Sequence, residues 1–251
     1  MIKKYATALA CLLLPRMLKP CALSLIGHRI HPSARIGFAI IWVDRLFMGP
    51  RATIGHLSVI SCRKLLMRHC SGIGNMNFVR GPIGLYLDRR ASIGNRNVVV
   101  SARAPLSGQA VSYLWLGSLA KITASHMIDV TRSIRIRQNS TLAGKGSQIW
   151  THGYVHAHSG PGRARIDGRV SVGENTYIGA MSCISPSVNI GNSITVGSHS
   201  SVATDLLEPG VYVSARLRYI GGNPYNLRER HGLSVPDDLD PDVRLRQRTS
   251  A

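Results

Sequence analysis

The chain has 251 residues, of which 44% are hydrophobic and 17% charged, and it carries a net charge of +19. This composition excludes an intrinsically disordered protein, and the length suffices for one domain with a core or one long solenoid. The basic residues are scattered and no zinc-finger or RNP-like motif is present, so nucleic acid is not an expected partner. The charge favours attraction to anionic ligands or surfaces.

The first 27 residues contain two lysines followed by a largely apolar run over residues 6–14. That run is too short to span a bilayer. A basic start before a short apolar stretch also resembles a weak signal peptide, but two more basic residues follow at once and no small-x-small cleavage site appears. We expect residues 1–27 to form an amphipathic helix that caps the fold or touches a membrane surface, with a cleaved signal as the alternative.

An aliphatic residue followed by a small residue recurs every six positions in the C-terminal half: Val172, Ile178, Ile184, Ile190, Val196 and Val202. Three such units close a coil of 18 residues, in which the aliphatic residue points inward and stacks on its equivalent in the next coil. Glycine or another small residue is expected at the tight turns. The period therefore predicts a parallel β-helix and an all-β fold.

The same six-residue lattice runs back through the chain with interruptions. Its members are Ile30, Ile36, Trp42, Met48, Ile54, Ile60, Met67, Ile73, Val79, Leu87, Ile93, Val99, Leu116, Ile122, Ile128, Ile136, Leu142 and Gln148. We expect about eight coils over residues 28–213, with Ile54, Ile73, Ile93, Ile122, Ile178 and Val196 pointing inward. Residues 214–251 lack the repeat and form a C-terminal extension.

Two interruptions are long enough to be edge loops, one between Val99 and Leu116 and one between Gln148 and Val172. The second, over residues 149–171, holds three of the ten histidines: His152, His156 and His158. Loops on a rigid scaffold commonly carry function. We therefore predict an active-site loop at 149–171.

Residues 172–179, 184–191 and 196–197, with the closing segment at 203–210, resemble the C-terminal signature of the left-handed β-helix acyltransferases. That family includes maltose, galactoside and xenobiotic acetyltransferases and sugar O-acetyltransferases of polysaccharide gene clusters. The resemblance implies a left-handed coil and acyl transfer from acetyl-CoA as co-substrate, with no metal. It also implies a homotrimer with its sites between subunits.

A second match covers residues 121–129, 141–144 and 147–152, and is similar to sugar O-acetyltransferases in which a Thr-His pair opens the active-site loop. It implies that His152 is the general base for direct transfer to a sugar hydroxyl of a polysaccharide or lipid-linked precursor. His156 is the alternative base. His126 occupies a lattice position where small residues usually sit, so it is expected either as a second catalytic residue in the same cleft or as a core histidine.

The resemblance also suggests residues that contact the two substrates. The expected acceptor contacts are Asp129, Trp150, Tyr154, His156 and Tyr177, although Asp129 could instead orient a histidine or stabilise a coil. The expected acetyl-CoA contacts are Gly179, Ser185, Gly197, Thr204, Arg216 and Arg218. Residues 214–218 lack the Asn-Pro-Ala part of the family's usual motif, which leaves the details of CoA contact open.

Two interpretations from other classes remain open. A zinc enzyme of the γ-class carbonic anhydrase type uses the same coil and needs three histidines, for which His152, His156 and His158 give the count. A non-catalytic solenoid that binds an anionic surface would use the net charge alone. The five cysteines show no pairing pattern, so we expect a cytoplasmic protein, with the inner face of the membrane as a surface it can contact.

Overall fold

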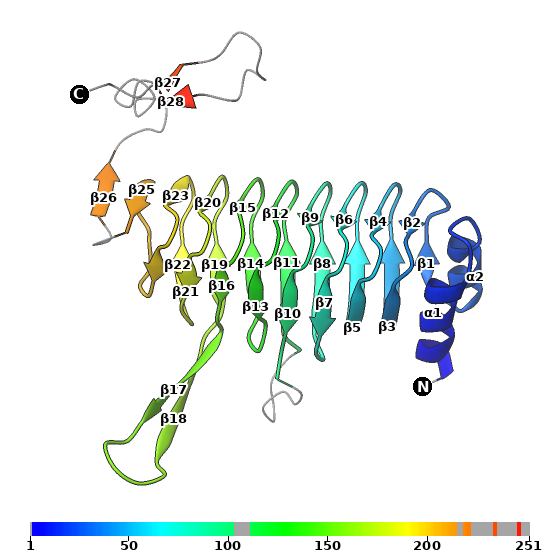
Figure 1. The fold of residues 1–251 in the computed structure, drawn as a ribbon, viewed down its shortest axis with the longest axis horizontal. Helices are drawn as coiled ribbons and strands as arrows, with labels where there is room; N and C mark the ends of the chain where they lie inside the picture. Colours follow the sequence, from blue (N-terminus) through cyan, green and yellow to red (C-terminus); the bar gives the residue numbers. More distant parts are fainter. Residues whose placement is uncertain (1, 103–110, 215–217, 222–232, 235–244, 247–251) are drawn as a thin grey trace.

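The computed structural model describes residues 2–102, 111–214, 218–221, 233–234 and 245–246. Two helices, α1 (Ile2–Leu13) and α2 (Lys19–Leu25), precede a stack of short parallel strands that coil around one axis (Figure 1). Each coil has three sides, so the stack has three faces. Helix α1 packs against the first long strand and α2 against the first short one. No helix in these ranges combines the length and hydrophobicity that a membrane span requires.

The first face is a sheet of nine parallel strands, closed by the antiparallel strand β26 (Arg218–Gly221). Its strands are β2 (Arg35–Ile36), β4 (Thr53–Ile54), β6 (Gly72–Ile73), β9 (Ser92–Ile93), β12 (Lys121–Ile122), β15 (Thr141–Leu142), β20 (Tyr177–Ile178), β23 (Ile194–Val196) and β25 (Gly210–Val213). Nine strands correspond to about nine coils in the described residues, against about eight predicted. The last coil places Tyr212 inward, and Tyr212 follows Val202 by ten residues, so it falls outside the six-residue lattice.

The other two faces are joined by two nine-residue strands, β3 (Ile40–Met48) and β5 (Val59–Met67), which continue from one face to the next. The second face contains β7 (Phe78–Arg80), β10 (Val98–Val100), β13 (Met127–Asp129), β16 (Gln148–Ile149), β21 (Cys183–Ile184) and β24 (Ser201–Val202). The third contains β1 (Arg29–Ile30), β8 (Gly84–Leu87), β11 (Tyr113–Leu116), β14 (Ile134–Ile136), β19 (Val170–Val172) and β22 (Asn189–Ile190). Beyond the stack lie β27 (Leu233–Ser234) and β28 (Leu245–Arg246).

The core is a set of aliphatic ladders running along the axis. On the first face, Ile36, Ile54, Ile73, Ile93, Ile122, Leu142, Ile178 and Val196 stand in register on consecutive strands. Each is at most 3% exposed. The predicted inward residues are therefore confirmed, and each removes an aliphatic side chain from water, which contributes roughly 1.5–3 kcal/mol before the entropy of ordering is counted.

Two members of the predicted lattice are wrong. Trp42 is half-buried and faces outward, where its ring meets that of Tyr5 from α1 at 4.5 Å, while Ile41 is fully buried. Gln148 is exposed, and Ile149 takes the inward position. Successive strand residues point to opposite sides of a sheet, so a shift of one residue exchanges inside for outside.

The corners work differently from the sequence expectation. Fourteen described residues other than glycine have φ between 54° and 70°, and each stands three positions after an inward residue, as Ser125 does after Ile122. The glycine directly after the inward residue, such as Gly94, does not have positive φ. It is required because the next coil passes so close that a Cβ on Gly94 would overlap the carbonyl oxygen of Thr123.

This close approach predicts that Gly94→Ala lowers the free energy of unfolding by about 1–3 kcal/mol, the usual cost of overpacking. Gly153→Ala is the matched control, because nothing lies within 4 Å of the Cβ it would add. Denaturant unfolding of both variants and the parent gives the comparison. Equal midpoints for Gly94→Ala and the parent would show that the coils can separate to accept a methyl group.

The insertion predicted at 149–171 is a two-stranded antiparallel hairpin, β17 (His152–His156) and β18 (Arg163–Asp167). It leaves the solenoid at the corner after β16 and projects far from the coils (Figure 1). The chain returns through β19. The core of the other predicted insertion, residues 103–110, lies outside the described part of the chain.

Candidate active site

The base of this hairpin places His152 against a carboxylate from the preceding coil. Ile128 pairs with Ile149, so the residues after them, including Asp129 and His152, meet at one corner. Nδ1 of His152 lies 2.7 Å from Oδ2 of Asp129. The Asp129 side chain is 3% exposed and the His152 side chain 30% exposed. A buried carboxylate therefore holds an imidazole whose other edge reaches solvent.

Two threonines complete the shell of the Asp129 carboxylate. Oδ1 accepts hydrogen bonds from the Thr131 hydroxyl at 2.6 Å and from its backbone N–H at 3.2 Å. Oδ2 accepts from the Thr151 hydroxyl at 2.7 Å and from its backbone N–H at 3.0 Å. Burial raises the pKa of Asp129, but the hydrogen bonds from Thr131, Thr151 and His152 together lower it by more, so the net pKa lies below the usual value.

An ionised Asp129 fixes the tautomer of His152. The carboxylate accepts the hydrogen bond, so Nδ1 carries the proton and Nε2 keeps its lone pair. No described residue hydrogen-bonds Nε2. In this tautomer Nε2 is the atom that can accept a proton from a bound ligand.

Two aromatic rings stand on either side of His152 in the chain. The ring centroids of Trp150 and Tyr154 are 6.4 and 6.3 Å from the imidazole, and both contacts are edge-on. The Trp150 indole N–H donates to the side-chain oxygen of Gln148 at 2.9 Å, while Tyr154 is 46% exposed. These rings offer apolar surface beside the open Nε2.

The hairpin face that carries His152 is otherwise polar and basic. Directly paired residues of an antiparallel ladder share a face, so His152, Tyr154 and His156 stand with their partners Asp167, Arg165 and Arg163. Asp167 pairs with Arg165 at 2.6 Å and with Arg132 at 3.1 Å, and the Arg163 guanidinium lies 4.9 Å from the Tyr154 ring centre. Sequence reasoning missed these arginines and Asp167, because only the hairpin register brings them to His152.

His156 lies four residues further along the same strand, about 13 Å from His152 at the usual rise of a strand. It is exposed, and its ladder partner is Arg163. His158 lies beyond the end of β17 and is also exposed. Within one chain, the described residues bring no three histidine, cysteine or acidic side chains together as a metal site.

Burial bears on two of the predicted roles. Asp129 is 2% exposed and its carboxylate contacts His152, which is the geometry of the orienting alternative. His126 is 1% exposed, and its Nδ1 accepts from the Ser147 N–H at 3.1 Å while Nε2 lies 2.9 Å from the Thr123 hydroxyl. These contacts are those of the core alternative for His126.

His126 makes stability depend on pH. Burial lowers its pKa to about 4, against an unfolded value of about 6.5. The folded state resists protonation, so this stabilisation is complete above pH 6.5 and is lost as pH falls towards 4. Between pH 7 and pH 4.5 the free energy of unfolding should therefore fall less for His126→Asn than for the parent, by about 2 kcal/mol. Denaturant unfolding at pH 7 and pH 4.5 tests this, and parallel curves for the two proteins would contradict it.

The predicted acetyl-CoA residues fall on two corners of the solenoid. Gly179 is buried, and a Cβ there would lie 2.6 Å from the backbone nitrogen of Ser198, so close coil packing requires glycine at this position. Gly197 follows β23 at the same corner line. The corners of successive coils stack into a line along the axis, and the hairpin leaves the solenoid at the corner after β16. Ser185 follows β21 and Thr204 follows β24, so they lie at this same corner line, one and two coils beyond Trp150.

Three other predicted residues do not join this corner. Tyr177 is 49% exposed on the first face, separate from the corner of His152 within one chain. Arg216 lies outside the described residues, and Arg218 is described only as the first residue of β26.

No protein-family model matches the chain, and no curated protein matches it. Among solved structures, the polysialic acid O-acetyltransferase OatWY is similar at 16% identity with a TM-score of 0.53, over 70% of this chain and 87% of that one. The polySia-specific acetyltransferase NeuO (14% identity, TM-score 0.43, 77% and 79% covered) is also similar. A mutant form of the N-acyltransferase AntD from Bacillus cereus, in complex with dTDP and coenzyme A, is similar as well. Its identity is 20% and its TM-score 0.42, over 57% of this chain and 78% of that one. With TM-scores under 0.5, these two support no further conclusion.

The comparison with OatWY bears on the fold alone, because identity is low. It agrees with the six-residue period, the three faces and the parallel register of the strands. The chain therefore has the hexapeptide-repeat fold, a left-handed parallel β-helix.

Proposed function

We propose that this protein is an acetyl-CoA-dependent O-acetyltransferase that acts on a sugar hydroxyl. The observation that carries the proposal is the His152–Asp129 pair at the base of the hairpin, with Nε2 of His152 open to a ligand. The sequence resemblance to sugar O-acetyltransferases assigns the general base to this same histidine. OatWY, which has the same fold, is itself named an O-acetyltransferase.

In the proposed reaction, Nε2 of His152 takes the proton of the acceptor hydroxyl as its oxygen attacks the acetyl carbonyl carbon. The C–S bond of the thioester then breaks, and the imidazolium returns the proton to the leaving thiolate. The products are the acetyl ester and free CoA, and no covalent enzyme intermediate is needed. Asp129 stabilises the imidazolium between the two steps and keeps the ring in one orientation.

We place acetyl-CoA along the corner that carries Ser185 and Thr204. The hairpin leaves the solenoid at the same corner line, one coil before Ser185. Coils are spaced at about 4.8 Å, so a flexible pantetheine arm running down this line would bring a thioester to His152. Arg216 and Arg218 are proposed to hold the phosphates, as the family resemblance implies.

We place the acceptor on the hairpin face beyond His152. Trp150 and Tyr154 supply aromatic surface, on which sugar rings commonly pack through their apolar faces, and Arg163 supplies hydrogen-bond donors. His156 lies at the outer end of this face, where it can contact a longer saccharide. This assignment explains why a hairpin projects from a solenoid that has no need of it for its core.

A homotrimer is part of the proposal, because one chain leaves the hairpin face and the corner line open on one side. The family builds its sites between subunits, and Tyr177 and Gly197, which one chain holds apart from His152, would come from a neighbour. Sedimentation at micromolar concentration tests this. The proposal also places the protein in the cytoplasm, which is consistent with its five free cysteines.

The test is release of free thiol from acetyl-CoA by the purified full-length protein, against a panel of sugars and lipid-linked oligosaccharides. We expect thiol release that depends on the acceptor and matches the acetyl ester formed. If calorimetry shows no binding of acetyl-CoA and no acceptor supports turnover, the non-catalytic solenoid replaces this proposal.

A further inference from the structure

Helix α1 carries an apolar face that points away from the solenoid. Its inner face buries Thr7, Ala10 and Cys11. Its outer face exposes Ile2, Tyr5, Leu9, Leu12 and Leu13, which are 42–86% accessible, although one edge of the Tyr5 ring also meets Trp42 of β3. They recur at intervals of three and four residues and so form one stripe along the helix. A helix on a water-facing surface normally places polar residues there.

Further large apolar side chains are exposed in the next turn and at the end of α2. Met17 and Leu25 are 90% and 85% exposed, and Leu18 is 55% exposed. Helices α1 and α2 and the turn between them lie at the same end of the molecule (Figure 1). We call the set of Ile2, Tyr5, Leu9, Leu12, Leu13, Met17, Leu18 and Leu25 the apolar cap. An exposed apolar surface of this kind marks a site of interaction.

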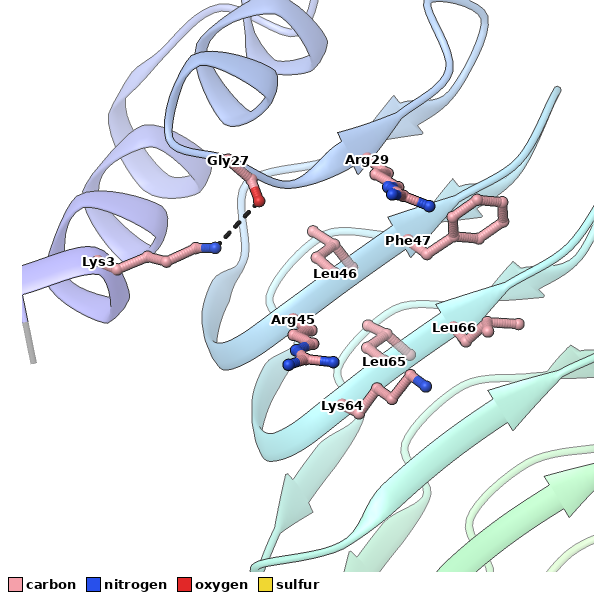
Figure 2. Close-up of a pocket in the computed structure, with 9 residues that line it drawn as sticks. All are labelled: Lys3, Gly27, Arg29, Arg45, Leu46, Phe47, Lys64, Leu65 and Leu66. Atoms are coloured by element: carbon pink, nitrogen blue, oxygen red, sulfur yellow. Dashed lines mark hydrogen bonds between the residues drawn. The ribbon is translucent and has the colours of Figure 1, made fainter.

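A cavity of about 440 Å³ lies where α1 meets the first coils, and basic residues line it (Figure 2). Lys3 of α1 donates a hydrogen bond to the carbonyl of Gly27 at 3.0 Å. Arg29, Arg45 and Lys64 project from β1, β3 and β5, three neighbouring strands. We call this cavity the basic groove.

The rest of the groove is apolar. Phe47 and Leu66 supply its accessible apolar side chains, whereas Leu46 and Leu65, which also line it, are 2% and 0% exposed and face the core. The other lining residues are Gly27 and the four cations, and no acidic residue is among them. Phe47 is 38% exposed. Such a lining suits a phosphate ester attached to hydrocarbon, because it neutralises the charge and contacts the chain.

The charge of the whole N-terminal end agrees with that interpretation. Residues 1–80 contain twelve lysines and arginines and one acidic residue, Asp44. Asp44 is itself paired with Lys4 at 2.9 Å. An anionic surface is therefore attracted to this end and finds almost no acidic group there to repel it.

We propose that the apolar cap and the basic groove dock this protein onto an anionic phospholipid surface. The cap side chains would enter the interface between headgroups and acyl chains, and the groove would receive lipid phosphates. Membrane attachment of a folded protein usually needs two such signals together, an apolar insertion and a basic patch. The inference does not depend on acetyl transfer, because it uses no residue of the His152 site.

The experiment is co-sedimentation of the full-length protein with vesicles of phosphatidylglycerol and phosphatidylcholine, and with vesicles of phosphatidylcholine alone. We expect binding to the anionic vesicles that weakens as salt is added. Each basic residue near such a surface contributes about fivefold, so Arg45→Gln/Lys64→Gln should weaken binding roughly 25-fold. Leu9→Gln/Leu13→Gln should weaken it by about tenfold or more.

The matched control is Arg96→Gln/Arg137→Gln, which removes the same charge from exposed positions on middle coils. It should bind within about threefold of the parent. If the groove pair and the control pair lose equal vesicle affinity, net charge alone explains the binding, and the proposal that the basic groove receives lipid phosphates is overturned. A Leu9→Gln/Leu13→Gln protein that keeps vesicle binding but changes its sedimentation coefficient would show that a second copy covers the cap, which would also overturn the proposal. Circular dichroism confirms that each variant is folded.

Discussion

His152→Ala is expected to lower turnover by about 10² to 10⁴, the usual range for removing a general base. The imidazole is held by Asp129 at 2.7 Å and is 30% exposed, so in the proposed reaction it is the group that takes the proton. The affinity for acetyl-CoA should change little, because the base interacts with the acceptor hydroxyl and not with the cofactor's phosphates. Steady-state kinetics and calorimetry with acetyl-CoA separate the two effects.

His156→Ala is the matched control, since it removes a histidine from the same strand about 13 Å further out. It should keep turnover within a few-fold of the parent while raising KM for a longer saccharide. If His152→Ala instead retains parental turnover and His156→Ala loses it, His156 is the base. A His152→Ala protein that loses bound zinc together with activity would establish the metal-enzyme alternative.

Asp129→Asn is expected to lower kcat by about 10² to 10⁴ with little change in KM, because an amide cannot fix the tautomer as the carboxylate does. The amide NH₂ can donate to Nδ1, which moves the ring proton to Nε2 and removes the lone pair that accepts the acceptor's proton. The carboxylate also accepts from the Thr131 and Thr151 hydroxyls, so some loss of stability is expected as well. Kinetics must therefore be referred to folded protein.

Nitrogen NMR of His152 gives a readout that a purely structural role would not move: the parent should show Nδ1–H at neutral pH and the variant Nε2–H. Asp44→Asn is the control, because it removes an acid that pairs with Lys4 far from the hairpin. The double variant His152→Ala/Asp129→Asn should be no slower than His152→Ala, since the two residues act as one unit. A simple product of the two losses would mean that Asp129 works through something other than His152.

The solenoid could be predicted without any long-range information. A period of six is a property of the chain read in order, and it located Ile54, Ile122 and Val196 in the core. It also located the insertion, because residues that do not fit the period of a solenoid leave its coils as a loop. The Thr151–His152 match then identified the histidine at the base of that insertion.

The surroundings of that histidine depend on the tertiary structure. Asp129 is 23 residues away in the chain and meets His152 because consecutive coils stack in register. The same stacking buries His126 and makes Gly94 a packing residue, and the hairpin register sets Arg163 beside Tyr154. Apolar residues occur on more than one side of α1, so the sequence alone does not show which side is exposed. The packing of α1 against β3 determines this. In each case the deciding contact comes from residues in another coil or strand, and a one-dimensional pattern does not record which neighbours they are.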